Sequence, residues 1–298
     1  MMAARETTAL RGELLHQEPL ARYTTWRVGG PARTLYRPAD AEDLAAFLQS
    51  LPPEEPLLWL GLGSNLLVRD GGFPGTVIAM QGRLSEIEVD GDRVHVGAGA
   101  ACARVARAAA RAGLSGAAFL AGIPGTMGGA LAMNAGAFGG ETWDCVREVR
   151  SIDRGGQRHV RGPGDYRVSY RKVSGPAGEW FLGATLQLQP GDSEAEQAAI
   201  RKLLDRRAET QPTGKPSGGS TFRNPPGDYA ARLIEAAGLK GYRLGGAEIS
   251  PKHANFVVSN EACRAADIEA LIEYARDQVE RRFGIRLQPE VHVVGVPA

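Results

Sequence analysis

The amino-acid sequence predicts an α+β protein with more than one domain. Short apolar strands separated by Gly and Pro turns fill most of the first 190 residues, whereas helices and strands alternate more plainly after Pro190-Gly191-Asp192. The chain has 298 residues, 43% of them hydrophobic, which is enough to bury two cores. We therefore expect a domain boundary near 192/193, to within several residues.

Periodicity and turn residues place the elements of the first part. After Asp40, a natural N-cap, the apolar residues Leu44, Phe47, Leu48 and Leu51 recur at helical spacing. A second helix, rich in Ala and Arg, is expected over 101–112. Strands are expected at 57–60, 66–69, 76–80, 93–98, 146–153, 158–161 and 181–189.

The second part begins with a helix from Ser193 to about Arg207, because Ser193 and Glu196 have the spacing of a capping box. The elements expected after it are a Pro/Gly/Ser loop at 212–227, a helix from Asp228 to Gly238, a strand at 255–259, an amphipathic helix through 268–279 closed by Gly284, and a last strand at 290–296.

Composition excludes several classes of function. The net charge of +1 predicts no nucleic-acid or membrane-surface partner through bulk electrostatics. The three cysteines form no CxxC pair and the five histidines no HxxxH or HExxH spacing, so neither a disulfide framework nor a catalytic metal is expected. Charged residues interrupt the first thirty positions, and no signal peptide is visible. We expect a cytoplasmic protein, and no protein partner is suggested.

The segment from Ala112 to Gly140 runs 29 residues without a charged side chain, yet it holds nine glycines. So many glycines leave too little apolar surface for a membrane span. Glycine is used where a Cβ would block a ligand, and exposed backbone N–H groups then bind anions. A phosphate-bearing cofactor and a tightly packed structural turn both remain open for this segment.

A shorter glycine motif, Leu60-Gly-Leu-Gly-Ser-Asn65, lies between two expected strands. It begins like a dinucleotide-binding fingerprint but fails it, because Leu66 and Leu67 replace the third glycine and a strand follows. Free N–H groups with the Ser64 and Asn65 side chains would suit a phosphate. An ordinary hairpin turn is the alternative.

Three further features carry polar chemistry. The loop at 216–225 places Gly218 and Gly219 directly before Ser220, so that its hydroxyl can approach a ligand, although serine in such a loop is usually a turn former. Glu290 opens a Val-rich strand, where it is either a salt-bridged edge residue or an acid in a cleft. The segment at 166–171 carries two arginines, suited to a carboxylate or simply forming a solvated edge.

Taken in order, these motifs resemble the UDP-N-acetylenolpyruvoylglucosamine reductase family, flavoenzymes of bacterial peptidoglycan synthesis. The resemblance covers nearly the whole chain. Its motifs lie at 24–31, 60–65, 122–129, 134–136, 166–169, 217–222, 253–256 and 288–290.

The resemblance implies a fold and a cofactor. Residues 1–192 would be an FAD-binding domain of the p-cresol methylhydroxylase/vanillyl-alcohol oxidase type, with two α+β subdomains that divide near 80–90, and 193–298 an α+β substrate-binding domain. FAD would be held without a covalent link. The residues implied at its pyrophosphate are Gly61, Gly63, Ser64 and Asn65 on one side, and Gly125, Gly128, Gly129 and Gly136 on the other.

The resemblance also implies a reaction. NADPH would reduce the flavin, and UDP-N-acetylglucosamine enolpyruvate would then accept hydride from flavin N5 at C3, giving UDP-N-acetylmuramate. Ser220 would give the proton to C2, while Arg167 and Glu290 would polarise the substrate carboxylate, with Arg171 as the alternative arginine. The substrate contacts implied are Asn224 and, less directly, Lys240 and His253.

The chain departs from the family pattern in two places. Little room is left between Ala184 and the Ser220 loop for the extra tyrosine-bearing loop of longer members, so we expect the shorter type. Glu248 stands where a Gln is expected, and no role is assigned to it. Three other interpretations stay open. They are another FAD-dependent oxidoreductase of the same superfamily, which should lack the Ser220/Glu290 pair, a non-catalytic FAD or nucleotide-sugar binding module, and an Ala-rich structural or interaction protein.

Overall fold

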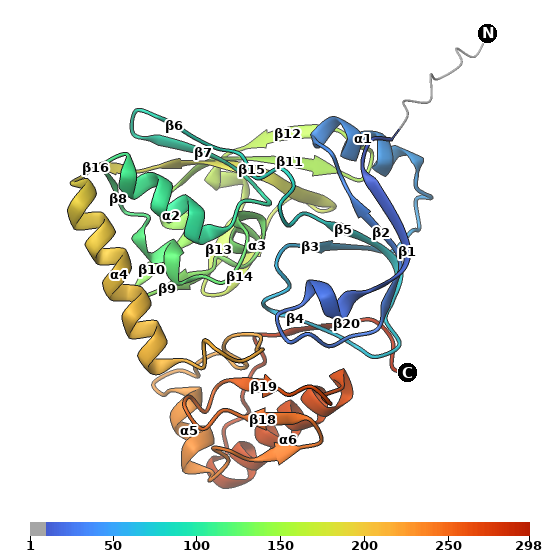
Figure 1. Ribbon diagram of the computed structural model, residues 1–298, viewed down its shortest axis with the longest axis vertical. Helices are drawn as coiled ribbons and strands as arrows, with labels where there is room; N and C mark the ends of the chain where they lie inside the picture. The colour runs from blue at the N-terminus through green and yellow to red at the C-terminus, as the bar shows by residue number, and fades with distance from the viewer. Residues whose placement is uncertain (1–9) are drawn as a thin grey trace.

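The computed structural model describes residues 10–298 and confirms the α+β class (Figure 1). A first sheet has the strand order β1-β2-β5-β3. Its strands are β1 (Glu13–Pro19), β2 (Pro31–Arg37), β3 (Leu57–Leu60) and β5 (Phe73–Ala79). Strand β5 runs parallel to both β2 and β3, and β1 pairs antiparallel at the edge. Helix α1 (Ala41–Ser50) buries Leu44, Phe47 and Leu48 beside this sheet.

A second, antiparallel sheet has the order β12-β11-β15-β7-β6. Its strands are β6 (Ile87–Asp90), β7 (Arg93–Gly97), β11 (Val146–Asp153), β12 (Arg158–Arg161) and β15 (Glu179–Gln187). The chain passes from the first sheet to the second between Ala79 and Ile87, within the region where the two subdomains are expected to divide. Helix α2 (Cys102–Arg111) packs its apolar side into the core of this second sheet.

Short elements fill the connections, and several of them line the site described below. They are η1 (Leu20–Tyr23), β4 (Leu66–Val68), β8 (Leu114–Ser115), η2 (Ala118–Gly122), α3 (Met127–Met133), β9 (Gly136–Ala137), β10 (Gly140–Glu141), η3 (Thr142–Asp144), η4 (Pro163–Asp165), β13 (Arg167–Ser169), β14 (Lys172–Ser174) and β16 (Gln189–Pro190).

The C-terminal part is a small sheet, β17-β18-β19, packed against two helices (Figure 1). Its elements are α5 (Ala230–Ala236), β17 (Arg243–Leu244), β18 (Ala247–Ile249), β19 (Val257–Ser259) and α6 (Ala265–Phe283). Gly284 ends α6 with a left-handed φ of 68°, as the sequence predicts. The chain closes with β20 (His292–Val294), which leaves this unit and pairs parallel with β4.

Two contacts bear on the expected boundary at 192/193. Helix α4 (Ser193–Thr210), which runs along the edge of the molecule in Figure 1, buries Ile200 in the core of the second sheet. Phe222 is the first later residue in the C-terminal core. The change of core therefore falls after α4 begins. Conversely, Trp26 belongs to the N-terminal part in sequence but lies in the C-terminal core, where its Nε1 donates to the carbonyl of Val257 at 2.8 Å.

Most predicted elements are present, with local differences. Asp40 caps α1 as expected, accepting from the N–H groups of Glu42 and Asp43. The N-cap of α4, however, is Asp192, whose side chain accepts from the N–H of Ala195, so the capping-box prediction centred on Ser193 is wrong by one residue. Strands β1 and β2 and helix α3 were not expected. Within the described residues, no helix is long and apolar enough to cross a membrane.

Candidate functional site

Two glycine-rich loops meet above the ends of the sheets. One follows β3 at residues 61–65, and the other, at residues 122–126, precedes α3. A Cβ added to Gly61 would lie 2.3 Å from Oγ1 of Thr126, and one added to Gly125 would lie 3.6 Å from Oγ of Ser64. Only a glycine at position 61 permits this approach, because the hydroxyl of the facing loop occupies the space of a side chain.

A cavity of about 160 Å³ lies where these loops approach the second sheet. Gly61, Thr126 and Gly129 line it on the loop side, and Trp59 and Trp180 line it on the other. A Cβ on Gly129 would meet nothing nearer than Thr126 Oγ1, at 3.8 Å, so the space beside it is open to a ligand.

Two of the residues that line the cavity carry a buried polar atom without a protein partner. Thr126 Oγ1 and Trp59 Nε1 are buried, and no group within residues 10–298 hydrogen-bonds either atom. Buried polar atoms are normally satisfied, so both atoms call for a ligand or water. A cofactor with phosphate and hydroxyl oxygens suits a hydroxyl and an indole N–H, and the residues present therefore fit the expected FAD.

At the other glycine positions predicted to bind the cofactor, local backbone structure already requires a glycine. Gly63 adopts a φ of +64°, and a Cβ there would lie 2.2 Å from the carbonyl of Tyr23. Gly128 donates its N–H to Ala98 at 2.8 Å, so that N–H is not free for an anion; its missing side chain instead lets α3 pack on Ala98. A Cβ on Gly136 would lie 2.6 Å from the carbonyl of Gly140 across the β9–β10 pair.

The loop that carries Ser220 lies against the first glycine loop. A Cβ on Gly219, which has a φ of +75°, would be 3.9 Å from the carbonyl of Ser64. Gly218 packs flat on Trp26, where a Cβ would be 2.4 Å from the indole ring. Directly after Ser220, the N–H of Thr221 donates to the carbonyl of Asn255 at 2.8 Å. Ser220 is thus held at the junction of the N-terminal and C-terminal parts.

Glu290 is hydrogen-bonded to the residue that follows this serine. Its N–H donates to the carbonyl of Thr221 at 2.8 Å, and its own carbonyl accepts from Nδ2 of Asn65 at 3.0 Å. Only 8% of the residue is exposed, and burial raises the pKa of its carboxyl group, opposed by the positive charges of Arg171 and Arg223. Glu290 therefore contacts both the loop that carries Ser220 and the first glycine loop, whose Asn65 lies 225 residues before it in sequence.

The two arginines of the β13–β14 hairpin have different environments. Arg171, half-buried in the turn, places Nε 2.9 Å from Oε1 of Glu290 and donates from Nη2 to the carbonyl of Gly136 at 3.0 Å. Arg167 is exposed on β13 and forms no ion pair in the part of the chain that the structure describes. The structure thus sets Arg171, rather than Arg167, against Glu290.

Arg223 is a residue of this site that the sequence analysis missed. It donates from Nη2 to the carbonyl of Arg171 at 3.2 Å, and its buried Nε has no partner within residues 10–298. Its position three residues after Ser220, in the same loop, was the available signal.

The predicted substrate contacts lie in the C-terminal part. Asn224 is exposed and accepts at Oδ1 from the N–H of Ala230 at 3.1 Å. Lys240 is exposed and pairs with Glu235 at 3.0 Å, while burial lowers the pKa of the half-buried His253, with Lys240 acting in the same direction. Glu248, left without a role, pairs with Arg243 at 3.3 Å.

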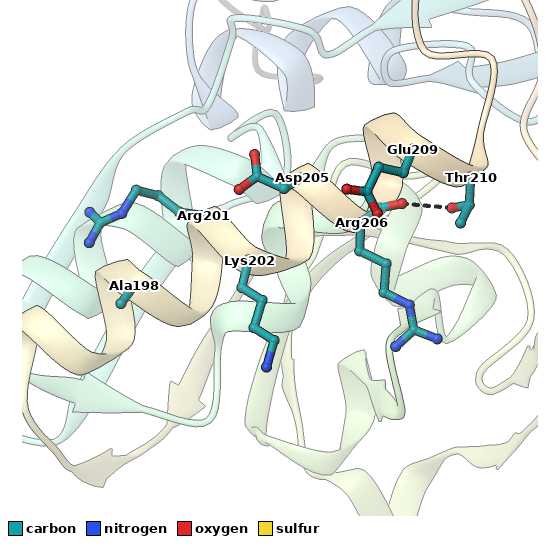
Figure 2. Close-up of a pocket in the computed structure, with 7 residues that line it drawn as sticks. All are labelled: Ala198, Arg201, Lys202, Asp205, Arg206, Glu209 and Thr210. Carbon is teal, nitrogen blue, oxygen red and sulfur yellow. Dashed lines mark hydrogen bonds between the residues drawn. The ribbon is translucent and has the colours of Figure 1, made fainter.

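A larger hollow on the outer face of α4 has a different character. Figure 2 shows that its seven lining residues, among them Arg201, Lys202 and Asp205, all project from this one helix. A single helix supplies no opposing wall, so this surface is not a cleft. Among residues 10–298, no group of three or more His, Cys, Asp or Glu could hold a metal ion.

Comparison with known proteins identifies two family matches. Residues 32–161 match the family described as FAD binding domain. Residues 211–294 match the one described as UDP-N-acetylenolpyruvoylglucosamine reductase, C-terminal domain.

Individual proteins match over almost their full length. The UDP-N-acetylenolpyruvoylglucosamine reductase of Alkalilimnicola ehrlichii is 62% identical over 295 residues, which cover 99% of each chain. That of Methylococcus capsulatus is 57% identical over 294 residues, covering 98% of this chain and 97% of the relative. The crystal structure of UDP-N-acetylenolpyruvylglucosamine reductase (MurB) from Thermus caldophilus superposes with a TM-score of 0.81 at 36% identity, covering 96% of this chain and 100% of that one.

The position of Gly61 yields a prediction for cofactor binding. In Gly61→Ala the new Cβ would press on Thr126 Oγ1 and into the cavity. We expect the affinity for FAD to fall roughly 10- to 100-fold, because overpacking costs about 1–3 kcal/mol. Titration of the flavin-free full chain with FAD measures this change. Gly164→Ala is the matched control, since a Cβ there meets nothing within 4 Å, and equal affinities in the two variants would contradict the assignment.

Proposed function

The chain belongs to the UDP-N-acetylenolpyruvoylglucosamine reductase family and is an FAD-containing oxidoreductase, and on this premise we propose that it reduces UDP-N-acetylglucosamine enolpyruvate to UDP-N-acetylmuramate with NADPH. The observation that carries the proposal is the hydrogen bond from the N–H of Glu290 to the carbonyl of Thr221, which joins the segment that carries the acid to the loop that carries Ser220. Free cysteines agree with a reducing compartment, and we place the reaction in the cytoplasm.

The glycine loops would hold the cofactor. Gly125 and Gly129 would leave room for the pyrophosphate, Gly61 lets the two loops approach each other, and Thr126 Oγ1 would bind one of the pyrophosphate oxygens. Ser64 and Asn65 would bind beyond it, toward Ser220. When bound, FAD would supply hydride chemistry between NADPH and C3 of the enolpyruvyl group.

Ser220 would supply the proton to C2. A serine hydroxyl is a very weak acid, so it can donate only when C2 becomes strongly basic and nearby groups stabilise the alkoxide that remains. The contacts around Ser220 supply candidates for that stabilisation. Arg171 lies 2.9 Å from Glu290, and Arg223 donates to the carbonyl of Arg171 and lowers the pKa of Glu290 by its charge; both arginines are permanently charged.

The two arginines of the β13–β14 hairpin, Arg167 and Arg171, would then have different roles. Arg171 is already engaged by Glu290 and by the carbonyl of Gly136, so we assign it to positioning the acid. Arg167, exposed on the same hairpin, is available to an incoming carboxylate. This division keeps the role that the family resemblance implies for Arg167 and explains the contacts of Arg171.

The nucleotide-sugar part of the substrate would contact the C-terminal unit. Asn224 follows Ser220 in the same loop, and its amide nitrogen can serve as a donor to the substrate. Lys240 and His253 lie close enough for the lysine charge to lower the histidine pKa. An exposed ammonium group and an imidazole edge suit a diphosphate.

The serine role predicts a selective defect. Ser220→Ala should be reduced by NADPH at the normal rate but reoxidised by UDP-N-acetylglucosamine enolpyruvate about 10²-fold or more slowly, because the proton donor acts only in the second half-reaction. Anaerobic stopped-flow absorbance of the flavin separates the two steps. Thr213→Ala, an exposed hydroxyl in the same loop region, serves as the control. Normal reoxidation of Ser220→Ala would rule out the serine as donor.

The arginine assignment predicts two separable phenotypes. Arg167→Ala should slow substrate-dependent reoxidation about tenfold or more, because a charge-assisted contact to the substrate is lost. Its effect on the unfolding free energy should add to that of Glu290→Gln to within about 0.5 kcal/mol, because the two residues are not in contact. Arg171→Ala and Glu290→Gln should instead couple by about 1–3 kcal/mol, as groups in contact do. Urea unfolding of the single and double variants gives the coupling. If Arg167→Ala were reoxidised at the normal rate and Arg171→Ala were not, binding of the substrate carboxylate would have to be assigned to Arg171.

A further inference from the structure

Arg223 connects the loop that carries Ser220 to two other segments of the candidate site. Its backbone N–H donates to the carbonyl of Gln288 at 2.9 Å, two residues before Glu290. Its side chain donates from Nη2 to the carbonyl of Arg171 at 3.2 Å. One residue thus joins the Ser220 loop to the segment that carries the acid and to the turn of the β13–β14 hairpin.

The hairpin turn that Arg223 contacts has a strained backbone. Ser169 pairs with Lys172 across the hairpin, which leaves a turn of two residues. The second of them, Arg171, has a φ of +54°, in the left-handed region that a residue with a Cβ adopts only at a cost. Such a conformation persists where the surrounding structure supports it, and a hydrogen bond to the Arg171 carbonyl is support of this kind.

The contact of Arg171 with Glu290 orients this turn only weakly. Arg171 Nε lies 2.9 Å from Oε1 of Glu290, but it has no aligned hydrogen-bond partner within residues 10–298. Attraction between two charges depends less on direction than a hydrogen bond does. Orientation comes instead from the hydrogen bonds of Arg171 Nη2 to the carbonyl of Gly136 and of Arg223 Nη2 to the carbonyl of Arg171.

The charge of Arg223 also acts on Glu290. Burial raises the pKa of the Glu290 carboxyl, while the positive charges of Arg171 on the hairpin and of Arg223 on the Ser220 loop oppose this rise. Asn65, which the first glycine loop contributes next to Glu290, is neutral. Arg223 therefore favours the ionised acid, which is the form that attracts Arg171.

We propose that Arg223 is a positioning residue for the substrate-dependent half of the reaction. It holds the turn of the β13–β14 hairpin against the Ser220 loop and so keeps Arg171 beside Glu290. The inference rests on the proposed function, in which Arg167 on the same hairpin binds the substrate carboxylate. Without this tether the hairpin separates from the loop, and the acid and Arg167 lose their alignment.

Hydrogen exchange of the full chain as purified, followed by mass spectrometry, tests the tether without the reaction. Arg223→Met removes the donor, with the fold verified by circular dichroism. We expect the amides of 167–174 to exchange about three- to tenfold faster, as loss of one hydrogen bond would allow. Arg282→Met is the matched control, because Arg282 Nη1 also donates to the carbonyl of another element, that of Ala236 at 3.1 Å. It should leave exchange of the hairpin within about twofold.

The pH dependence of substrate-driven reoxidation tests the charge. In Arg223→Met the acid limb of the profile should move to higher pH by about half a unit or more, because a cation that favours the Glu290 carboxylate is lost. Arg223→Lys keeps the charge and should leave the limb where it lies in the wild type. A purely structural defect would lower the rate at every pH without moving the limb.

Three outcomes would overturn the proposal: unchanged exchange at 167–174 in Arg223→Met, an equal increase in Arg282→Met, or an acid limb that stays in place in Arg223→Met. Arg223→Gln, which has a shorter and neutral side chain, gives the same comparisons if Arg223→Met does not fold. If the hairpin loosened as expected but the wild-type flavin ignored the substrate, the proposed function would fail and the tether would stand.

Discussion

The candidate site depends on one side chain, Asn65, which joins the first glycine loop to Glu290. Its Nδ2 donates to the carbonyl of Glu290 and lies 3.1 Å from the sulfur of Met133, and its backbone carbonyl accepts from the N–H of His292. The parallel pairing of β20 with β4 extends this connection. Because the last strand returns to the N-terminal part, the position of Glu290 is fixed relative to the loop expected to carry the flavin. Each hydrogen bond contributes only about 1 kcal/mol, and their common effect is alignment.

Steric exclusion is the second constraint. Three chain segments converge near Ser220, and glycines at 61, 218 and 219 stand where a side chain would prevent contact or strain the backbone. This arrangement explains why the glycine motifs are needed even where the N–H groups do not serve an anion. Gly128 is the clearest example, since its N–H is bound to Ala98 and its value lies in the close packing of α3. A glycine-rich motif thus combines ligand space with packing.

The sequence predicted the α+β class and the elements with strong local signals. Asp40 before a periodic apolar run and Gly284 after another gave helices that the structure contains. Strands β1 and β2 were missed because their register depends on pairing with each other and with β5, which no local pattern reveals. Helix α3 was missed because its glycines have low helix propensity, and its packing on the second sheet overrides that preference.

The sequence predicted which residues belong to the candidate site, but it did not predict how those residues contact one another. Ser220 and Glu290 were expected together, and they adjoin through Thr221. The ion pair of Arg171 with Glu290, the place of Arg223 and the unsatisfied N–H of Trp59 depend on contacts between distant segments, so spacing alone could not reveal them.

The most direct measurement is the visible spectrum of the purified full-length protein, followed anaerobically. The account predicts an oxidised-flavin spectrum that bleaches on addition of NADPH and returns only when UDP-N-acetylglucosamine enolpyruvate is added. A flavin that bleaches and then ignores this substrate would contradict the account and indicate another oxidoreductase of the same fold.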